Sequence, residues 1–316
     1  MKAVICKNYG PPDVLSIENI EKPVPKSDEL LVQVIAATVT SGVSVVRKGK
    51  HPQSILLTVL LRLMFGITKP KNKILGYEFS GVIEAVGKGV SQYKVGDKVF
   101  GTTTGLKQGS YAEYLCVPEK WKRGVVSKMP DNLSFDQSAA VPIGAMTALH
   151  LLKKSDIKEN QKIMVYGASG SVGTYAVQIA KYFKAHVTGV TSSANISLVQ
   201  SIGADKMLDY TAGSLTGNDK YDIVFDAVGK LKTSFAKKLL HKNGRFITVH
   251  SITQEKEDYM KLLISLIEQG KIKPVIEKVF SLEKIVDAHR LVDSGRKKGN
   301  VVIRIGDLPT PSISMN

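Results

Sequence analysis

Short apolar runs alternate with helical periodicities through the second half of the chain. Residues 163–166 are apolar, which predicts a buried parallel strand that ends at Gly167. The next segment repeats apolar residues at helical spacing, which predicts a helix packed on the sheet: Val172, Ala176, Ile179, Ala180 and Phe183. Similar runs predict further strands over 186–190, 206–208, 222–227 and 245–249. This alternation predicts an α/β domain with a parallel sheet that binds ligands at the carboxyl ends of its strands.

The first hundred residues follow a different pattern. Short apolar runs between glycine and proline turns predict strands over 3–6, 15–17, 30–36, 81–86 and 98–100, and Gly109 begins the turn into another. We interpret these strands as a small β-barrel.

Helical periodicity returns after Ser134. We predict one helix over 139–149, led by Asp136 and carrying Pro142 in its interior. Near the end of the chain we expect a helix over 260–268, a strand over 273–280, a helix over 283–292 and a strand over 301–305. Residues 306–316 are expected to form a frayed tail.

Residues 55–67 break the pattern of the first half because they are almost wholly apolar. The segment is too short to span a bilayer, contains Arg62 and is followed by Lys69, Lys71 and Lys73. A helix that is apolar nearly all round should be buried, as a lid over a substrate pocket or against another subunit. An interfacial membrane helix flanked by lysines is the alternative.

Composition adds few constraints. A chain of 316 residues with 43% hydrophobic content can form about two domains, each with its own core. The formal net charge is +16, but the lysines are scattered, so we predict no nucleic-acid partner. Cys6 and Cys116 are the only cysteines, and the N-terminus lacks the apolar core of a signal peptide, so we expect a reducing cytoplasm.

The turn after residue 166 carries the first candidate chemistry. Ala168, Gly170 and Gly173 occupy the three fixed positions of the dinucleotide fingerprint Gly-x-Gly-x-x-Gly, with Gly167 one place earlier. A helix start offers unpaired N–H groups, and glycines let a diphosphate approach the main chain. A sharp turn without a ligand is the alternative. We predict cofactor contacts along the turn, at Gly167, Ala168, Ser169, Gly170, Ser171, Val172 and Gly173.

The next strand end indicates which nucleotide is bound. A cofactor with a free ribose 2′-hydroxyl usually meets an Asp or Glu there, whereas residues 191–195 contain no carboxylate, which favours NADP(H). Asn195 and Tyr210 are candidates for the 2′-phosphate, the alternative being ordinary surface polar groups. Further cofactor contacts are expected at the ends of these strands, at Ser192, Val228, Val249 and Ser251.

Several motifs together resemble the medium-chain dehydrogenase/reductase superfamily, and most closely its zinc-independent quinone oxidoreductase branch. They lie at 1–3, 9–15, 76–82, 95–99, 109–114, 139–142, 167–173, 203–205 and 225–229. The resemblance implies a GroES-like β-barrel catalytic domain over 1–121 with a return segment over 270–316. It also implies a doubly wound Rossmann domain that binds NADP(H) over 122–269, usually in a homodimer.

The resemblance also bears on metal binding. Zinc-containing members place a Cys near Thr38, a His at Tyr77 and a Cys or Asp beyond Pro142, and this chain has none of these ligands. The four-cysteine lobe expected after Val99 is missing too, so we expect no metal. Without a Lewis acid, simple alcohol oxidation is disfavoured, whereas hydride can still pass from NADPH to a quinone or an α,β-unsaturated carbonyl (enone).

The catalytic side chains are less clear from the resemblance. An Asn and two Tyr residues line the pocket in quinone reductases, and the matching positions here are Thr40, Val45 and His51. His51 can relay a proton because histidine titrates near neutral pH, although a surface histidine is the alternative. Tyr77 can donate its hydroxyl to the substrate oxygen, or simply pack in the cleft wall.

Two other residues match family positions. Thr147 matches a position whose side chain touches the nicotinamide. Arg47 fits a salt bridge in the barrel as well as it fits the site.

Two other functions remain open. The chain could be a catalytically weak NADPH-binding protein, membrane-associated through residues 55–67. It could also be an NAD(P)-dependent alcohol dehydrogenase with an atypical site, in which case zinc should co-purify with it.

Overall fold

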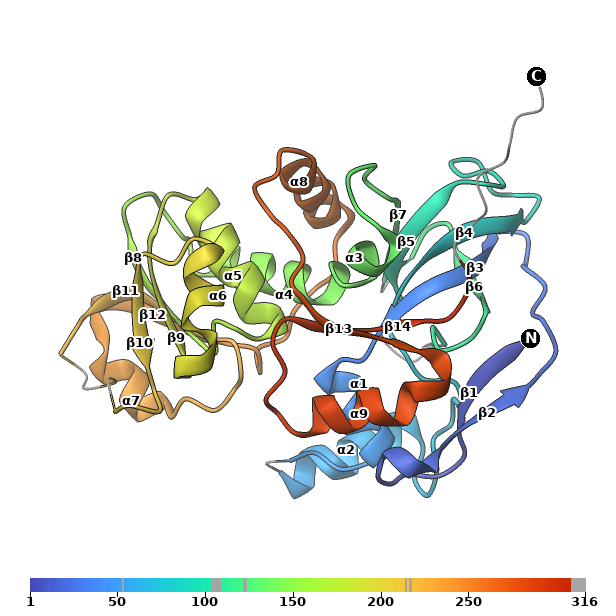
Figure 1. Ribbon diagram of the computed structural model, residues 1–316, viewed down its shortest axis with the longest axis horizontal. Helices are drawn as coiled ribbons and strands as arrows, with labels where there is room; N and C mark the ends of the chain where they lie inside the picture. The colour runs from blue at the N-terminus through green and yellow to red at the C-terminus, as the bar shows by residue number, and fades with distance from the viewer. Residues whose placement is uncertain (53, 104–108, 122–123, 214, 216–217, 308–316) are drawn as a thin grey trace.

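A computed structural model describes residues 1–52, 54–103, 109–121, 124–213, 215 and 218–307. Its strands form two large sheets and one hairpin, and the two sheets lie at opposite ends of the molecule (Figure 1). Most of the expected tail, 308–316, lies outside the described residues. The predicted combination of a β-rich half and a parallel α/β half is confirmed.

The parallel sheet has five strands in the order β10-β9-β8-β11-β12. Its bounds are β8 (Lys162–Tyr166), β9 (His186–Thr191), β10 (Lys206–Asp209), β11 (Tyr221–Asp226) and β12 (Leu240–Thr248). Every pair in the sheet is parallel. The strand order reverses next to β8, so the carboxyl ends of β8, β9 and β11 meet at one edge, where such sheets bind their ligands.

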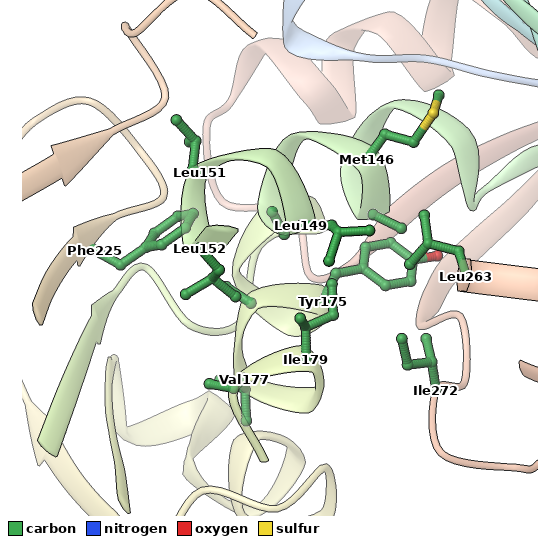
Figure 2. Packing of buried hydrophobic residues seen from close by; sticks show 14 of the residues in the cluster. Met146, Leu149, Leu151, Leu152, Tyr175, Val177, Ile179, Phe225, Leu263 and Ile272 are labelled. Carbon is green, nitrogen blue, oxygen red and sulfur yellow. The ribbon is translucent and has the colours of Figure 1, made fainter. Parts of the chain in front are cut away.

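Helices cover both faces of this sheet. Successive side chains of a strand point to opposite faces, and apolar residues occupy both faces here. Ile163 and Val165 of β8 face a core with α4 (Pro142–Lys154), α5 (Ser171–Tyr182), α6 (Ile196–Ser201) and α8 (Glu257–Glu268). Met164 faces the opposite core, with α7 (Thr233–Lys238). Figure 2 shows the first core, in which Leu149 of α4 and Tyr175 of α5 pack together.

The second large sheet has seven strands. Six follow the order β13-β14-β3-β4-β5-β7, and β6 also pairs with β3. The bounds are β3 (Glu29–Thr38), β4 (Glu78–Val86), β5 (Lys98–Thr102), β6 (Tyr114–Pro118) and β7 (Val125–Lys128), with β1 (Lys2–Cys6) and β2 (Leu15–Asn19) as a separate hairpin. The strands expected in the first hundred residues are therefore present.

The end of the chain returns to this seven-stranded sheet. β13 (Ile276–Ser281) and β14 (Asn300–Arg304) are parallel to each other and connected through α9 (Ile285–Asp293). β14 then pairs antiparallel with β3, with Val302 opposite Thr38. The α8, β13, α9 and β14 elements match the order predicted for residues 260–305.

The helix predicted over 139–149 is wrong as a single element. The chain forms α3 (Phe135–Ala139) and then α4, which begins at Pro142. Ser134 and Gln137 cap α3 reciprocally through side chain and backbone. Proline has no N–H to continue a helix but fits the first turn, so Pro142 starts α4 instead of lying inside a helix.

The helix expected over 55–67 forms as α2 (Ile55–Phe65), after α1 (Ser41–Lys48), but the expectation of burial is wrong for the chain by itself. None of its residues is buried. Figure 1 shows α2 at the lower edge of the molecule, below α1 and α9. No helix among the described residues has the length and apolar character needed to cross a membrane.

Candidate cofactor and active site

The turn after β8 has the close backbone packing that its glycine motif predicts. Gly167 adopts φ 78°, and Gly170 begins α5 without a side-chain cap. A Cβ at Gly173 would lie 2.1 Å from the Gly167 carbonyl oxygen, so only glycine lets α5 approach the turn. The first backbone N–H groups of α5 have no acceptor inside the helix and can donate hydrogen bonds to the oxygens of a diphosphate, so the turn fits a dinucleotide.

A small hydroxyl and amide network joins the turn to the end of β9. The Thr191 hydroxyl donates to Ser169 Oγ at 2.8 Å, and Asn195 Nδ2 donates to Ser169 Oγ at 3.2 Å and to Ser192 Oγ at 3.4 Å. Asn195 Oδ1 is buried and has no hydrogen-bond partner among the described residues. An orphaned acceptor of this kind fits a hydroxyl group of a bound ligand. The structure thus brings together three predicted contacts, Ser169, Ser192 and Asn195.

Tyr210 lies beside this network on the surface. Its side chain is half exposed, and its ring lies 6.4 Å from the ring of Tyr166, measured between centroids. Its backbone N–H donates to the Thr191 carbonyl at 3.1 Å, which fixes it next to the end of β9.

Asp209 is a carboxylate near the predicted 2′-phosphate region that the sequence analysis missed. It ends β10 and pairs with Thr191 of β9. Hydrogen bonds from the Ser193 hydroxyl and from Thr211 lower the pKa of Asp209 to about 2. The dinucleotide pattern points only to the end of β9, whereas this acid lies on the neighbouring strand.

The loop after β11 is shaped by a buried carboxylate. Asp226 accepts hydrogen bonds from the backbone N–H of Val228 at 3.0 Å, of Gly229 at 2.8 Å and of Leu231 at 2.9 Å. The loop lies against the glycine turn, because a Cβ at Gly167 would meet Val228 Cγ2 at 2.1 Å. The predicted contacts at Gly167 and Val228 are therefore neighbours.

The end of β12 lies beside the same loop. The backbone N–H of Val249 donates to the Asp226 carbonyl at 3.1 Å, and that of Ser251 donates to Thr248. His250 places Nε2 2.9 Å from the Gly229 carbonyl oxygen. Val249 and Ser251 thus follow a strand end that contacts the loop held by Asp226.

His51 faces this loop from the other half of the molecule. Its ring lies 6.5 Å from the ring of His250, measured between centroids. Its backbone N–H donates to Thr58 Oγ1 at 2.9 Å, which holds it at the start of α2. The predicted proton relay therefore lies across from the loop that follows β12.

Tyr77 and Thr40 lie together at the start of α1. A Cβ at Gly42 would come within 3.7 Å of Thr40 Oγ1 and 3.9 Å of Tyr77 Cε2. Thr40 Oγ1 accepts from the Val43 N–H and caps α1, so a local structural role accounts for this hydroxyl oxygen. Tyr77 is half-buried against the apolar cluster of α1 and α9.

Glu78 joins the two halves of the molecule. In the sequence it stands out only as a member of the motif at 76–82. Its carboxylate is buried and accepts hydrogen bonds from the Thr38 hydroxyl and from the Ile143 N–H, the latter at 2.6 Å. Burial raises the pKa of Glu78 to about 7. Thr147, the predicted nicotinamide contact, is half-buried one helical turn after Ile143.

Lys297 is a second residue that sequence reasoning missed. Its Nζ donates to the Gly299 carbonyl at 2.6 Å, and burial lowers its pKa to about 8 against the opposing effect of Glu78. The Gly299 N–H donates to the Ser169 carbonyl at 2.8 Å, so this segment crosses the glycine turn. Its only signal in the sequence was a basic stretch before the last strand.

α4 completes the junction between the halves. A Cβ at Gly144 would lie 2.8 Å from Ser171 Oγ, so α4 and the start of α5 are in close contact. The Ser171 hydroxyl donates to Asn300 Oδ1 at 2.5 Å. Glu78, α4 with Thr147, and the glycine turn therefore lie together between the two large sheets.

Arg47 lies away from this junction. It is fully buried and pairs with Asp293, with His289 and with the Gly10 carbonyl. Of the two roles considered for Arg47, these contacts correspond to the salt bridge.

The residues at the expected zinc positions have other partners. The Thr38 hydroxyl donates to Glu78, and Tyr77 packs beside α1. Within the described part of the chain, no group of three or more His, Cys, Asp or Glu residues is arranged to hold a metal ion.

Three family models match the chain. The model described as "Alcohol dehydrogenase GroES-like domain" matches residues 26–131. The model described as "Zinc-binding dehydrogenase" matches residues 171–276, and a second model with this description matches 250–303.

Relatives with known names cover nearly the whole chain. A 2-methylene-furan-3-one reductase of Solanum lycopersicum is 33% identical over 96% of this chain and 79% of its own length. An NADPH-dependent alkenal/one oxidoreductase of Arabidopsis thaliana is 31% identical with the same coverage. The solved structure of the quinone oxidoreductase from Coxiella burnetii superposes with a TM-score of 0.82 at 25% identity, over 97% of this chain and 99% of that one.

Proposed function

Because this chain belongs to the medium-chain dehydrogenase/reductase superfamily, in its quinone oxidoreductase-like branch, we propose that it transfers a hydride from NADPH to a quinone or an α,β-unsaturated carbonyl. One observation carries the proposal. The glycine turn, the ends of β11 and β12, and the barrel residues around Glu78 converge at one junction. Such a junction holds donor and acceptor together and excludes water.

The nucleotide is proposed to bind along the glycine turn. The amides of Ser171, Val172 and Gly173 would hold its diphosphate, and the loop held by Asp226 would line the nicotinamide side through Val228. Thr147 and Val249 would also line the nicotinamide. When bound, NADPH supplies the hydride.

We propose that the network at the end of β9 favours NADPH over NADH. Ser192, Asn195 and Tyr210 offer neutral polar groups where an NAD-specific chain would present a carboxylate. Asp209 lies beside this region, and its oxygens accept hydrogen bonds from Ser193 and Thr211. It is therefore occupied by hydroxyl and amide donors and is not free to bind a ribose hydroxyl.

The acceptor is proposed to lie between Tyr77 and His51. Reduction of a quinone or an enone adds one hydride and one proton, so the chain must offer a proton donor. The Tyr77 hydroxyl and the His51 imidazole are the proposed donors, and Thr40 is proposed to shape the pocket as the cap of α1. No metal is assigned a role, because the Thr38 hydroxyl serves Glu78 and Tyr77 stands where a ligand would be expected.

The remaining organisation is also proposed. The catalytic domain would comprise 1–121 with 270–316, and the cofactor domain 122–269, in a homodimer. The pairing of β14 with β3 supports the return segment. Neither Cys6 nor Cys116 forms a disulfide in the described chain, which supports a reducing location such as the cytoplasm.

The test is the rate of NADPH oxidation by chelator-treated protein, measured with a small quinone and with a small enone, beside NADH at equal concentration. We expect faster consumption of NADPH and no effect of added zinc. Activity that requires zinc would overturn the metal-free mechanism. NADPH binding without turnover of either acceptor class would favour a non-catalytic binding protein.

A further inference from the structure

α2 presents an unusual apolar surface to solvent. Its exposed large side chains include Ile55 at 86%, Leu56 at 77% and Leu63 at 66% relative exposure. The same surface continues through the rest of the helix and the residue after it, at Leu57, Val59, Leu60, Met64 and Ile67. Water-soluble helices normally turn such residues toward a core, whereas no described residue of this chain covers this face.

The polar side chains of α2 contact the protein instead of water. The Thr58 hydroxyl bonds to the Ser54 carbonyl and the His51 N–H, and Arg62 Nε donates to the Gly49 carbonyl at 3.0 Å. Phe65 packs against the apolar cluster of α1 and α9. Residues 58, 62 and 65 share one side of a helix, so α2 is amphipathic in the inverse sense, with its polar groups inward.

The turn after α2 fixes the helix and places lysines at its end. Tyr9 Oη donates to the Gly66 carbonyl at 2.6 Å, and the Lys71 N–H donates to the Phe65 carbonyl at 2.6 Å. A Cβ at Gly66 would lie 2.0 Å from the Lys69 carbonyl oxygen, which shows how tightly the chain folds back. The apolar face is therefore held in place before any partner arrives.

The segment that carries this face contributes charge of one sign. The sequence contains no Asp or Glu between Glu29 and Glu78. The same stretch contains exposed lysines next to both ends of α2, at Lys50, Lys69, Lys71 and Lys73, whereas Lys48 is paired with Asp293 at 3.0 Å. A partner that covers the apolar face therefore also meets cations, which indicates that the partner is anionic.

We propose that α2 and its flanking lysines, here called the α2 face, dock the protein on an anionic lipid bilayer. The helix would lie in the plane of the interface with its leucines among the acyl chains and its lysines at the headgroups. With 11 residues it reaches only into one leaflet.

A second copy of the chain fits the α2 face less well. Two identical α2 faces brought together would also bring together two sets of lysines, and this segment offers no carboxylate to pair with them. An anionic bilayer satisfies both the apolar and the cationic parts of the surface.

The first experiment is flotation of the full chain with phosphatidylcholine vesicles and with mixed phosphatidylcholine and phosphatidylglycerol vesicles. We expect binding to the mixed vesicles that weakens as salt is raised. The double variant Leu60→Glu with Leu63→Glu should weaken that binding by about a hundredfold or more. The control, Val24→Glu with Val95→Glu, makes the same change in charge at two exposed apolar residues outside α2 and should bind like the parent.

A second variant separates charge from apolar burial. Lys69, Lys71 and Lys73 changed together to Gln should reduce binding to mixed vesicles by the order of a hundredfold. The control changes three exposed lysines elsewhere, Lys237, Lys238 and Lys242, to Gln and should have a much smaller effect. Equal losses in the two triple variants would mean that net charge alone drives binding and would overturn the proposal.

Fluorescence gives a readout that does not depend on flotation. Trp121 is the only tryptophan, so Leu60→Trp adds a reporter to the α2 face. Its emission should shift to the blue with mixed vesicles, whereas that of Val24→Trp should not. A parent that stays in solution with both kinds of vesicle overturns the proposal. If the parent forms dimers in solution without vesicles and the Leu60→Glu and Leu63→Glu double variant does not, the α2 face is a contact with a second copy and not with a membrane.

Discussion

Arg47 Nε lies 3.2 Å from His289 Nδ1, and both side chains are completely buried. An Arg Nε–H can only donate, so Nδ1 must accept and the imidazole is neutral with its proton on Nε2. Asp293 pairs with Arg47 and balances its charge. Burial, together with the Arg47 charge, lowers the pKa of His289 to about 3. This contact ties α1 to α9 and therefore holds the returning segment on the barrel.

The neutral state of His289 predicts acid sensitivity. An unfolded histidine takes up a proton below about pH 6.5, whereas His289 in the folded chain does so only near pH 3. The contribution of His289 to stability is therefore lost as the pH falls through this interval, by about 2 kcal/mol between pH 7 and pH 5. His289→Gln keeps an acceptor for Arg47 and does not titrate, so it should remove this contribution and make the change in stability from pH 7 to pH 5 about 2 kcal/mol more favourable than in the parent. Denaturant unfolding at both pH values measures it.

His186 provides the matched control, because it is exposed on the parallel sheet. His186→Gln should leave the pH dependence of the parent unchanged. If His289→Gln leaves it unchanged as well, the histidine is not held neutral in the folded chain.

The glycine turn predicts a second result. Gly173→Ala places a Cβ 2.1 Å from the Gly167 carbonyl oxygen, so α5 must move away from the turn. We expect at least about a tenfold weaker affinity for NADPH, because the amides that meet the diphosphate move with α5. Titration calorimetry with NADPH measures the change.

Gly42→Ala is the control for this substitution. It adds the same methyl group in the first turn of α1, where the nearest atom lies 3.7 Å away. NADPH affinity should stay near the parental value there. A Gly173→Ala protein that binds NADPH normally would mean that the cofactor does not use this turn.

Sequence reasoning worked best where local patterns report local structure. The strands around Gly167 and the helix after it follow from periodicity and from the glycine positions, because a close strand-to-helix turn requires those residues. α2 was located correctly, but the described part of the same chain does not bury it. Hydrophobicity shows that a surface needs a cover, and it does not show whether the same chain supplies one.

The site residues that could not be predicted from the sequence depend on contacts between distant segments. Glu78 meets Ile143 and Lys297 only because β4, α4 and the loop before β14 converge in the fold. Asp209 reaches the end of β9 through strand pairing. No spacing within one segment encodes such neighbours.

Cofactor preference yields a third prediction. Asn195→Asp places a carboxylate at the end of β9, where it repels a 2′-phosphate and can accept from a ribose hydroxyl. The ratio of kcat/KM for NADPH to that for NADH should fall by about tenfold or more. Asn243→Asp makes the same charge change on exposed β12 and should preserve the ratio. An unchanged ratio in Asn195→Asp would exclude Asn195 from the 2′-phosphate region.

Glu78 predicts a pH effect opposite to that of His289. An acid whose folded pKa is raised from 4.5 to about 7 favours the folded state while it is protonated. That stability is lost as the pH rises through this interval, by about 2–3 kcal/mol between pH 5 and pH 8. Glu78→Gln resembles the protonated acid and should remove the contribution of Glu78, so its stability relative to the parent should rise by about 2–3 kcal/mol from pH 5 to pH 8, as measured by denaturant unfolding. Glu84→Gln, on the same strand but exposed to solvent, is the control and should keep the pH dependence of the parent.

The two buried groups therefore offset each other between pH 5 and pH 7 in the parent chain. Glu78→Gln alone should make stability rise with pH, because the effect of His289 is no longer opposed. His289→Gln alone should make stability fall with pH, because only Glu78 remains. The double variant should again be nearly flat, since the two residues lie in different contact networks and their effects should add. A double variant that still follows either slope would mean that another group controls the pH dependence.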